Sequence, residues 1–482
     1  MAATTQAAPS ASGEPTKLFG HIRLWLALVG LVTILAGLLF GYDQGIISGA
    51  LQFIQQDFGL SQLLTEVVTS WVTLGALVGA LLAGGLADKL GRRLTLILAG
   101  ALFLAGALLS GLAPGTAVLV LGRLVIGFGV GVASVAAPLY AAELAPAESR
   151  GRFVSSYQLA ITIGILVAYI VDDILSSSGN WRLMLGGASV LGVVLMVFVL
   201  AMPESPRWLV RARRSDDAAR VLDKVRGTAY TPDAMAALEA ELAADEDQAS
   251  WGEVFSHRLR KPLLVGFGLA VFQQITGINA IIYYADEIFA QAGFTTPEQQ
   301  ARATLYAVGV VNVLATFIAI AYVDRFGRKP LLRAGLVGMF VSLAAVGGAF
   351  LAFDESATTG GGPSTVGIIT VIGLVVFIAS FAFSLGPVTW TMISEIFPTR
   401  VRGRAIAVAT AANWGAAFLV AQFFLSLTDA ISTTGTFWLF ALFCAVAFVW
   451  IGRKVPETKG RSLEEIEAMW RLDDDPASAD GA

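Results

Sequence analysis

Apolar runs of about 20 residues recur along the whole chain, and this feature constrains its fold more than any other. A helix of about 20 apolar residues spans the hydrocarbon core of a bilayer, where the backbone must satisfy its polar groups within helices or closed barrels. Of the 482 residues, 56% are hydrophobic and only 14% are charged, whereas soluble domains carry about 25% charged residues. The sequence therefore predicts an all-α membrane protein.

We expect twelve transmembrane helices, and we predict five segments along the chain. Residues 1–16 are rich in Ala, Ser, Thr and Pro and are expected to form a disordered tail rather than a cleaved signal peptide. A six-helix bundle over 17–202, a cytoplasmic helical linker over 203–260, a second six-helix bundle over 261–455 and a cytoplasmic tail over 456–482 complete the chain. The expected spans are 22–50, 65–86, 94–113, 116–142, 152–175, 182–202, 261–292, 302–323, 330–353, 366–397, 403–428 and 433–453.

The basic residues fall almost entirely on one side of these spans. Of 32 Lys and Arg residues, only Arg182 and Arg302 lie in loops on the opposite side, and Arg123 lies within a span. Cytoplasmic loops are enriched in Lys and Arg, so the basic side, with both termini and the linker, is predicted to be cytoplasmic. We therefore expect a multi-pass protein of the cell (inner or plasma) membrane.

The two predicted bundles repeat short motifs at matching places. DKLGRR at 88–93 recurs as DRFGRK at 324–329, and PES at 203–205 recurs as PET at 456–458. Glu143 followed by RGR at 150–152 recurs as Glu395 followed by RGR at 402–404. Two pseudo-symmetric six-helix bundles with a cleft between them are the architecture of alternating access.

The seventh span, FGLAVFQQITGINAIIYY at 267–284, is the predicted centre of function. Its three amides, Gln273, Gln274 and Asn279, are costly in hydrocarbon unless something hydrogen-bonds them. On a straight helix Gln274 points away from the face that the other two share with Tyr283 and Tyr284. We predict a helix break near Thr276 and Gly277 and a mid-membrane cavity for a small neutral polyhydroxy compound.

Five motifs in this order resemble the sugar porter branch of the major facilitator superfamily. They are DKLGRR, PESPRWL, QQITGIN, DRFGRK and PETKG, and the resemblance covers about Leu35 to Gly460. It extends both to bacterial proton–sugar symporters and to animal glucose facilitators. The fold it implies is the major facilitator fold, with twelve transmembrane helices in two pseudo-symmetric bundles.

The resemblance also implies a set of sugar-binding residues. An amide both donates and accepts hydrogen bonds, as sugar hydroxyls do, and an indole covers the apolar face of a sugar ring. Alternatively, Gln158, Asn312 and Trp414 only hold helices together. The implied ligands are Gln158, Gln273, Gln274, Asn279, Asn312, Trp390, Asn413 and Trp414, with Phe40 and Tyr283 as pocket walls.

Asp43, within the first span, decides the expected mechanism. Arg123, in the fourth span, is the only basic residue within a span and is its natural partner. In the family, proton-coupled members carry an acid at this position and facilitators a neutral residue. The repeat places Asn279 at the equivalent position of the second half. An intramembrane acid is functional by default, so we predict proton coupling at Asp43 and Arg123; a fixed structural ion pair is the alternative.

Charged residues on the cytoplasmic side resemble the inner gate of the family. Their ion pairs would lock the outward-open state and break in the inward-open one. The alternative, that the arginines only set topology, leaves the glutamates at helix ends unexplained. Gly386 and Pro387 supply a flexible point for an extracellular gate. The predicted gate residues are Asp88, Arg92, Glu143, Arg152, Asp324, Arg328, Glu395 and Arg404.

These observations predict a proton-coupled hexose symporter that acts by alternating access. D-glucose is the leading substrate, because Asn413 before Trp414 resembles the glucose carriers. A facilitative uniporter is the nearest alternative; a non-transporting sugar sensor is another, against which the short tail after Arg471 counts. We expect a monomer in a lipid bilayer and no nucleic-acid partner.

No set of residues in the sequence predicts an enzyme. We expect no cofactor beyond the proton as coupling ion. A metal site is not expected either, because the chain has one cysteine, Cys444, and two histidines, His21 and His257, outside the apolar runs.

Overall fold

The structure is a computed structural model that describes residues 15–145, 150–226, 232–246, 251–352, 364–398, 401–461, 465–466 and 470. Within these residues the regular structure is helical throughout, with no strand. The described chain begins with helix α1 at Pro15, so the predicted tail over 1–16 lies almost wholly outside the described residues, as does most of the tail after residue 461.

The first half of the molecule contains the first six spans. The sixth is made of two helices that join at Ala188, so the chain bends there without leaving the span. The helices are α1 (Pro15–Phe58), α2 (Gln62–Leu90), α3 (Arg92–Gly111), α4 (Thr116–Leu144), α5 (Arg150–Leu175), α6 (Trp181–Gly187) and α7 (Ser189–Ala201).

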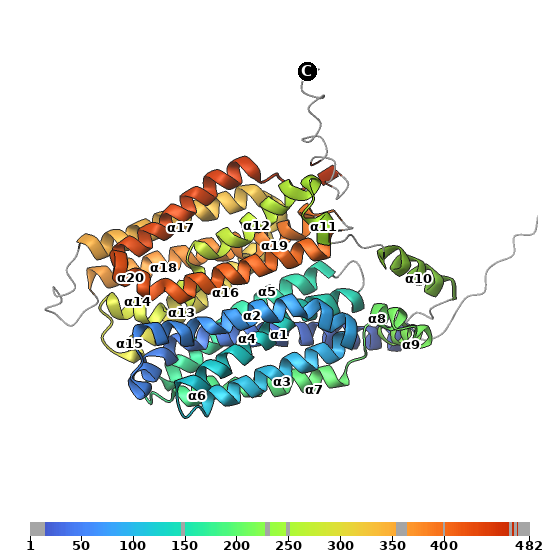
Figure 1. Ribbon diagram of the computed structural model, residues 1–482, viewed down its shortest axis with the longest axis horizontal. Helices are drawn as coiled ribbons and strands as arrows, with labels where there is room; N and C mark the ends of the chain where they lie inside the picture. Colours follow the sequence, from blue (N-terminus) through green and yellow to red (C-terminus); the bar gives the residue numbers. More distant parts are fainter. Residues whose placement is uncertain are drawn as a thin grey trace, which may run out of the picture.

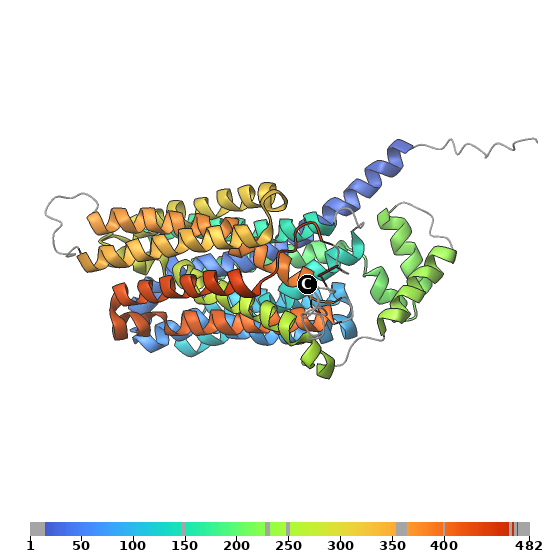
Figure 2. The same ribbon diagram turned by 90° about the horizontal axis from the view of Figure 1, so that it is seen from above.

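The described residues of the predicted linker form short helices. Its elements are α8 (Pro206–Arg211), α9 (Ser215–Arg226), α10 (Pro232–Glu246), α11 (Trp251–Val254) and the 3-10 turn η2 (His257–Leu259). They lie together at one end of the bundle (Figure 1). We call this the linker end and the opposite end, with α6 and α15, the far end. The beginning of α1 projects at the linker end (Figure 2).

The second half contains more interruptions than the first. Its elements are α12 (Arg260–Ile275), α13 (Ile278–Tyr283), α14 (Ala285–Gln291), α15 (Pro297–Thr304), the π-helix η3 (Leu305–Val310), α16 (Val311–Phe326), α17 (Arg328–Ala352), α18 (Thr365–Phe383), α19 (Leu385–Ile396) and α20 (Arg402–Lys454).

Eleven helical stretches within the described residues are long and apolar enough to cross a membrane. The last, α20, is 53 residues long and contains Ser432 with φ 68°, where the chain leaves helical geometry. It therefore holds both the eleventh and the twelfth predicted spans, which confirms the twelve predicted spans.

The tenth span breaks at Ser384, slightly before the flexible point predicted at Gly386 and Pro387. Helix α18 ends at Phe383, and Ser384 has φ −125° and ψ −92°. Pro387 has no N–H group, and its ring clashes with the carbonyl of the residue four positions earlier in a continuous helix. That residue is Phe383, so the proline accounts for the place of the break.

The two halves lie side by side with their long helices roughly parallel (Figure 1). Within the first half, α1 and α5 pack with almost no space between their backbones. A Cβ at Gly41 would lie 1.9 Å from the carbonyl oxygen of Ile161, so only glycine fits there. This close packing fixes the position of Asp43, two residues further along α1.

Candidate functional site

The seventh span breaks where the sequence predicts. Helix α12 ends at Ile275, α13 starts at Ile278, and Gly277 between them has φ +98°. A Cβ on Gly277 would lie 2.7 Å from the ring of Phe440 on α20. A left-handed backbone and the adjacent ring both require glycine here.

Gln273, Gln274 and Asn413 form one amide cluster between α12 and α20. Nδ2 of Asn413 donates to Oε1 of Gln273 at 2.7 Å, and Nε2 of Gln274 donates to Oδ1 of Asn413 at 3.2 Å. Nε2 of Gln273 also donates to the carbonyl of Leu385 at 2.8 Å, at the break of the tenth span. Gln274 therefore joins the cluster instead of pointing away from it, because α20 packs against both glutamines.

The other predicted amides keep unused hydrogen-bonding capacity. Asn279 and Asn312 are buried, with 4% and 5% of their surface exposed, and Gln158 is half-buried. None of the three side chains forms a hydrogen bond with another described residue. Their hydrogen bonds are available to a ligand, as is Oε1 of Gln274, which has no partner among the described residues.

The predicted aromatic walls come from both halves. The rings of Phe40 on α1 and Trp414 on α20 lie 5.3 Å apart between centroids. The hydroxyl of Tyr283 on α13 accepts a hydrogen bond from Nε2 of Gln44 at 3.4 Å, again across the two halves. Trp390 on α19 is half-buried and packs against the core.

Asp43 and Arg123 form the predicted pair. Nη1 of Arg123 lies 2.5 Å from Oδ1 of Asp43, and the side chains are 0% and 4% exposed, respectively. Nε of Arg123 also donates to the carbonyl of Val68 at 3.3 Å, while its Nη2 has no hydrogen-bond partner among the described residues. The pair thus links α1, α2 and α4 in the interior of the first half.

At the linker end, three predicted gate residues of the first half lie together. Nε of Arg92 lies 3.0 Å from Oε2 of Glu143, and its Nη1 lies 3.2 Å from Asp88. Glu204, after the sixth span, accepts hydrogen bonds from the backbone N–H groups of Arg92 and Arg93 at 2.9 and 3.1 Å. A carboxylate therefore caps the N-terminus of α3 from another segment.

The second half repeats this arrangement. Arg328 lies 3.1 Å from Glu395, and the hydroxyl of Thr458 donates to the same carboxylate at 2.6 Å. Glu457 accepts from the backbone N–H groups of Arg328 and Lys329 at 3.1 and 3.0 Å, at the start of α17. Partial burial raises the pKa of Glu457, but these and two further backbone donors outweigh it, and the pKa lies below its usual value.

The structure gives less detail for three other predicted gate residues. The side chains of Arg152 and Asp324 lie outside the described residues. Arg404 is half-buried and interacts with other groups. The pairs that are placed, Arg92 with Glu143 and Arg328 with Glu395, each lie within one half of the molecule.

Sequence reasoning missed the contacts that join the halves at the far end. Both carboxylate oxygens of Glu66 accept from the backbone N–H and hydroxyl of Ser426, at 2.6 and 2.7 Å. Ser70 Oγ donates to Oε1 of Gln422 at 2.7 Å. Two further buried acids, Asp172 and Asp286, lie in the same region. The available signal was the acidic residues in or beside apolar runs, which are rare without a function.

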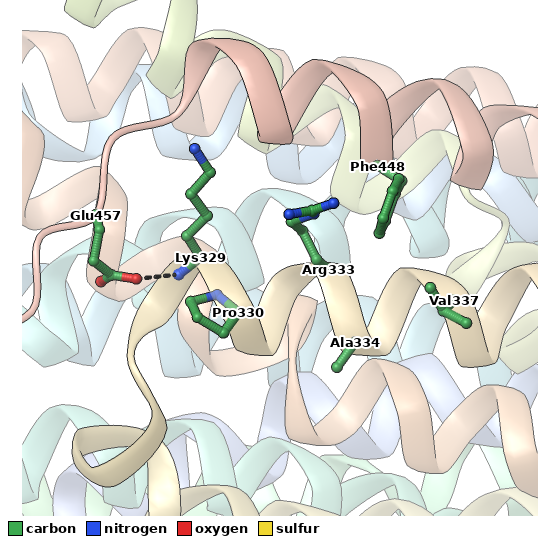
Figure 3. Close-up of a pocket in the computed structure, with 7 residues that line it drawn as sticks. All are labelled: Lys329, Pro330, Arg333, Ala334, Val337, Phe448 and Glu457. Atoms are coloured by element: carbon green, nitrogen blue, oxygen red, sulfur yellow. Dashed lines mark hydrogen bonds between the residues drawn. The ribbon is translucent and has the colours of Figure 1, made fainter.

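A hollow of about 570 Å³ lies elsewhere, at the linker end of the second half. Figure 3 shows Lys329, Arg333 and Val337 along α17, with Phe448 and Glu457 beside them. The guanidinium of Arg333 stacks 4.3 Å from the ring centroid of Phe448. This hollow is separate from the amides and from Asp43, so it is not the candidate substrate site.

The fold and the site together define a class of protein, a secondary transporter of the major facilitator type. Two six-helix halves surround a broken helix lined with neutral amides, which is how such transporters build a substrate site.

Comparisons with known proteins narrow this class. Residues 29–470 match the family model described as sugar (and other) transporter. The galactose-proton symporter of Escherichia coli strain K12 is 41% identical over 90% of this chain and 92% of its own length. The glucose transporter GlcP of Staphylococcus epidermidis is 41% identical over 91% of this chain and 96% of its own. The solved structure of the proton:xylose symporter XylE superposes with a TM-score of 0.76 at 31% identity, over 93% of this chain and 99% of that one.

The chain belongs to the sugar transporter family of the major facilitator superfamily. It is a multi-pass membrane transporter of sugars and not an enzyme, and transporters of this kind need no cofactor. The sensor alternative finds no support among these relatives.

Proposed function

We propose that this protein imports a hexose, with D-glucose the leading substrate, together with a proton. The buried pair of Asp43 and Arg123 carries the proposal. A carboxylate at the centre of a membrane costs about 2.5–3.5 kcal/mol, and only a nearby cation or a proton relieves that cost. Asp43 therefore has two stable states, paired with Arg123 or protonated.

These two states supply the coupling step. Proton binding to Asp43 releases Arg123, sugar binding then permits the halves to move, and loss of the proton on the other side restores the ion pair. The bond from Nε of Arg123 to the carbonyl of Val68 leaves the guanidinium one acceptor when Asp43 is neutral. The protonation state of Asp43 thus determines whether α1 is held to α4 by the ion pair.

The available driving force is sufficient for accumulation. A potential of 100 mV supplies about 2.3 kcal/mol per charge, and one pH unit supplies about 1.4 kcal/mol. Together these correspond to an accumulation of several hundred-fold.

The sugar site is proposed between the halves, at the predicted ligands. Gln158, Asn279 and Asn312 offer free amides, and Gln273, Gln274 and Asn413 form a preorganised cluster. Trp390 and Trp414 stack on the sugar ring, with Phe40 and Tyr283 as walls. The named relatives that carry galactose and glucose support a hexose, and neutral ligands let the sugar leave again.

The linker end is proposed to face the cytoplasm, in accordance with the distribution of Lys and Arg. The protein then acts as a monomer in the cell membrane, with both termini inside. The predicted gate residues at the linker end bias the two states of the transporter. In the present structure the far end, which faces outward in this orientation, is closed by contacts between the halves.

Uptake of labelled glucose into proteoliposomes tests the proposal. An inward proton gradient is imposed or omitted, and the native chain is compared with Asp43→Asn. We expect the gradient to drive accumulation only in the native chain, while the variant retains exchange and downhill flux. If both proteins merely equilibrate glucose, the protein is a uniporter and the Asp43–Arg123 pair is structural. If xylose or galactose moves and glucose does not, the choice of substrate is wrong.

A further inference from the structure

Two buried carboxyl groups at the far end have no role in the coupling described above. Asp172 on α5 and Asp286 on α14 are 2% and 4% exposed. Consecutive residues of α1 hold them: the N–H of Gly49 donates to Oδ2 of Asp172, and the hydroxyl of Ser48 donates to Oδ1 of Asp286, both at 3.2 Å. Two consecutive residues of α1 thus hold two carboxyls, one from each half of the molecule.

This arrangement leaves one oxygen of each carboxyl without a partner. Oδ1 of Asp172 and Oδ2 of Asp286 are buried and accept no hydrogen bond from the described residues. Neither group forms an ion pair within that part of the chain, and the two repel each other when both are ionised. Two buried like charges without a cation are strongly unfavourable, and one proton bound to either carboxyl removes the repulsion.

The groups around the two carboxyls do not supply a compensating charge. Arg302 on α15 lies 3.6 Å from Asp173, the neighbour of Asp172, and forms no ion pair with either carboxyl among the described residues. The hydroxyl of Thr304, the last residue of α15, donates a hydrogen bond to Oδ1 of Asp286. The titratable groups that interact with the two carboxyls are Tyr42 on α1 and Tyr169 on α5. Asp173 and Glu287 adjoin them in sequence, and Arg302 lies beside Asp173. Tyr283 lies beyond Tyr169, and Asp43 and Arg123 lie beyond Tyr42 and Tyr283.

We propose that Asp172 and Asp286 form a proton-binding site between the two halves, separate from the Asp43–Arg123 pair, and that its proton is required to close the far end. The inference rests on the proposed function only in that the halves separate at the far end. On opening, Asp286 leaves Ser48 and both carboxyls meet water, where they ionise. Closing therefore takes up one proton, and a lower pH on the far side favours the closed state.

The site differs from the coupling pair in the path of its proton. The proton enters from the far side when that end closes and returns to the same side when it reopens. It crosses no membrane, so the proton-to-sugar ratio is unchanged. The far end therefore stays open in alkaline surroundings, even at a pH at which Asp43 still couples proton and sugar transport.

The test measures closure of the far end without sugar. Spin labels are attached to Ser177→Cys and Thr295→Cys, both exposed at the far end, in the full chain in lipid nanodiscs with Cys444→Ala. Pulsed electron resonance then gives the ratio of closed to open molecules as a function of pH. We expect the ratio in the native background to fall about tenfold per pH unit above the transition, as one proton requires. In Asp286→Asn and in Asp172→Asn the ratio becomes nearly independent of pH.

A matched control and a competing cation make the result decisive. Asp173→Asn removes the neighbouring, more exposed acid, and we expect it to keep the native pH dependence. A flat native profile, or a native slope in both single variants, overturns the proposal. The measurement is repeated at alkaline pH with choline or Na⁺ as the cation of the buffer. Closure with Na⁺ but not with choline overturns the proposal as well, because the site then binds a metal cation. In Asp43→Asn we expect the slope to persist, and its loss in that variant assigns the effect to the coupling pair instead. Absence of coupled uptake in the native chain, with the native slope intact, counts only against the proposed function.

Discussion

The guanidinium of Arg123 lies 2.5 Å from the carboxylate of Asp43, and both side chains are almost completely buried. An exposed pair at the far end offers a contrast, since Arg182 and Asp57 lie 2.9 Å apart with nearly half of each side chain exposed. The same chemical pair thus occurs in two environments, and the cost of breaking each one follows from its burial.

Removal of the cation alone is expected to destabilise the fold. Arg123→Gln leaves Asp43 buried without a charge partner, which costs about 3–5 kcal/mol at neutral pH. Because protonation of Asp43 relieves this cost, the deficit should shrink as the pH falls. Thermal unfolding in detergent, followed by tryptophan fluorescence across pH, measures both effects.

Two variants control this measurement. Asp43→Asn combined with Arg123→Gln should recover most of the lost stability, and Arg182→Gln should cost less than about 1 kcal/mol. Equal losses in Arg123→Gln and Arg182→Gln would show that burial of the pair has no energetic weight.

The two kinds of amide in the site should respond differently to substitution. Asn279 has no hydrogen bond to a described residue, so Asn279→Ala should weaken sugar binding by about 5- to 100-fold and leave the melting temperature nearly unchanged. Asn413 bonds to the carbonyl of Ala270 at 3.0 Å as well as to both glutamines. Asn413→Ala should therefore lower both affinity and stability. Isothermal titration with glucose and thermal unfolding separate the two; an equal loss of stability in both variants contradicts the distinction.

The sequence predicted those features of the site that depend on one helix or on charge. Gly277 marks the break because glycine tolerates the left-handed backbone. Asp43 and Arg123 are the matching acid and base within apolar spans of the first half. The motif repeats placed Glu143 and Glu395 beside arginines of the preceding loops. Each of these relationships follows from residue type and local spacing.

The features that the sequence did not predict depend on which helices meet. Gln274 turns into the amide cluster because α20 packs across both glutamines, and nothing in the seventh span alone indicates this. Ser70 and Gln422 are unremarkable in their own spans and pair only because α2 meets α20. Asp286 lies in α14, beyond the predicted break in the seventh span, and nothing in the sequence indicates that it is buried against α1.

The break at Gly277 gives a further prediction. Gly277→Ala puts a methyl group 2.7 Å from Phe440 and forces a left-handed backbone on alanine, with a cost of about 1–3 kcal/mol. Gly84→Ala is the control, since a Cβ at Gly84 meets no atom within 4 Å. We expect a lower melting temperature and slower uptake only for Gly277→Ala. Comparable melting temperatures of the two variants would rule out strain at the break.

Glu457, which caps the N-terminus of α17, should make the stability of the protein depend on pH. The pKa of Glu457 is lower in the folded than in the unfolded protein, so its contribution is complete above the unfolded pKa and disappears as the pH falls through the folded one. Glu457→Gln should remove about 1 kcal/mol at neutral pH and little in acid. Unfolding at both pH values tests this, with the exposed Asp429→Asn as control; an equal loss at both pH values argues against a charge effect.

Glu204 and Glu457 do the same work in the two halves, whereas Asp43 and Asn279 at equivalent positions do not. If the two halves arose by duplication, both inherited the same carboxylate cap, and both have kept it as Glu204 and Glu457. The equivalent positions Asp43 and Asn279, by contrast, have diverged to different residues. New substrate preferences can therefore evolve in one half while the caps that stabilise both halves stay unchanged.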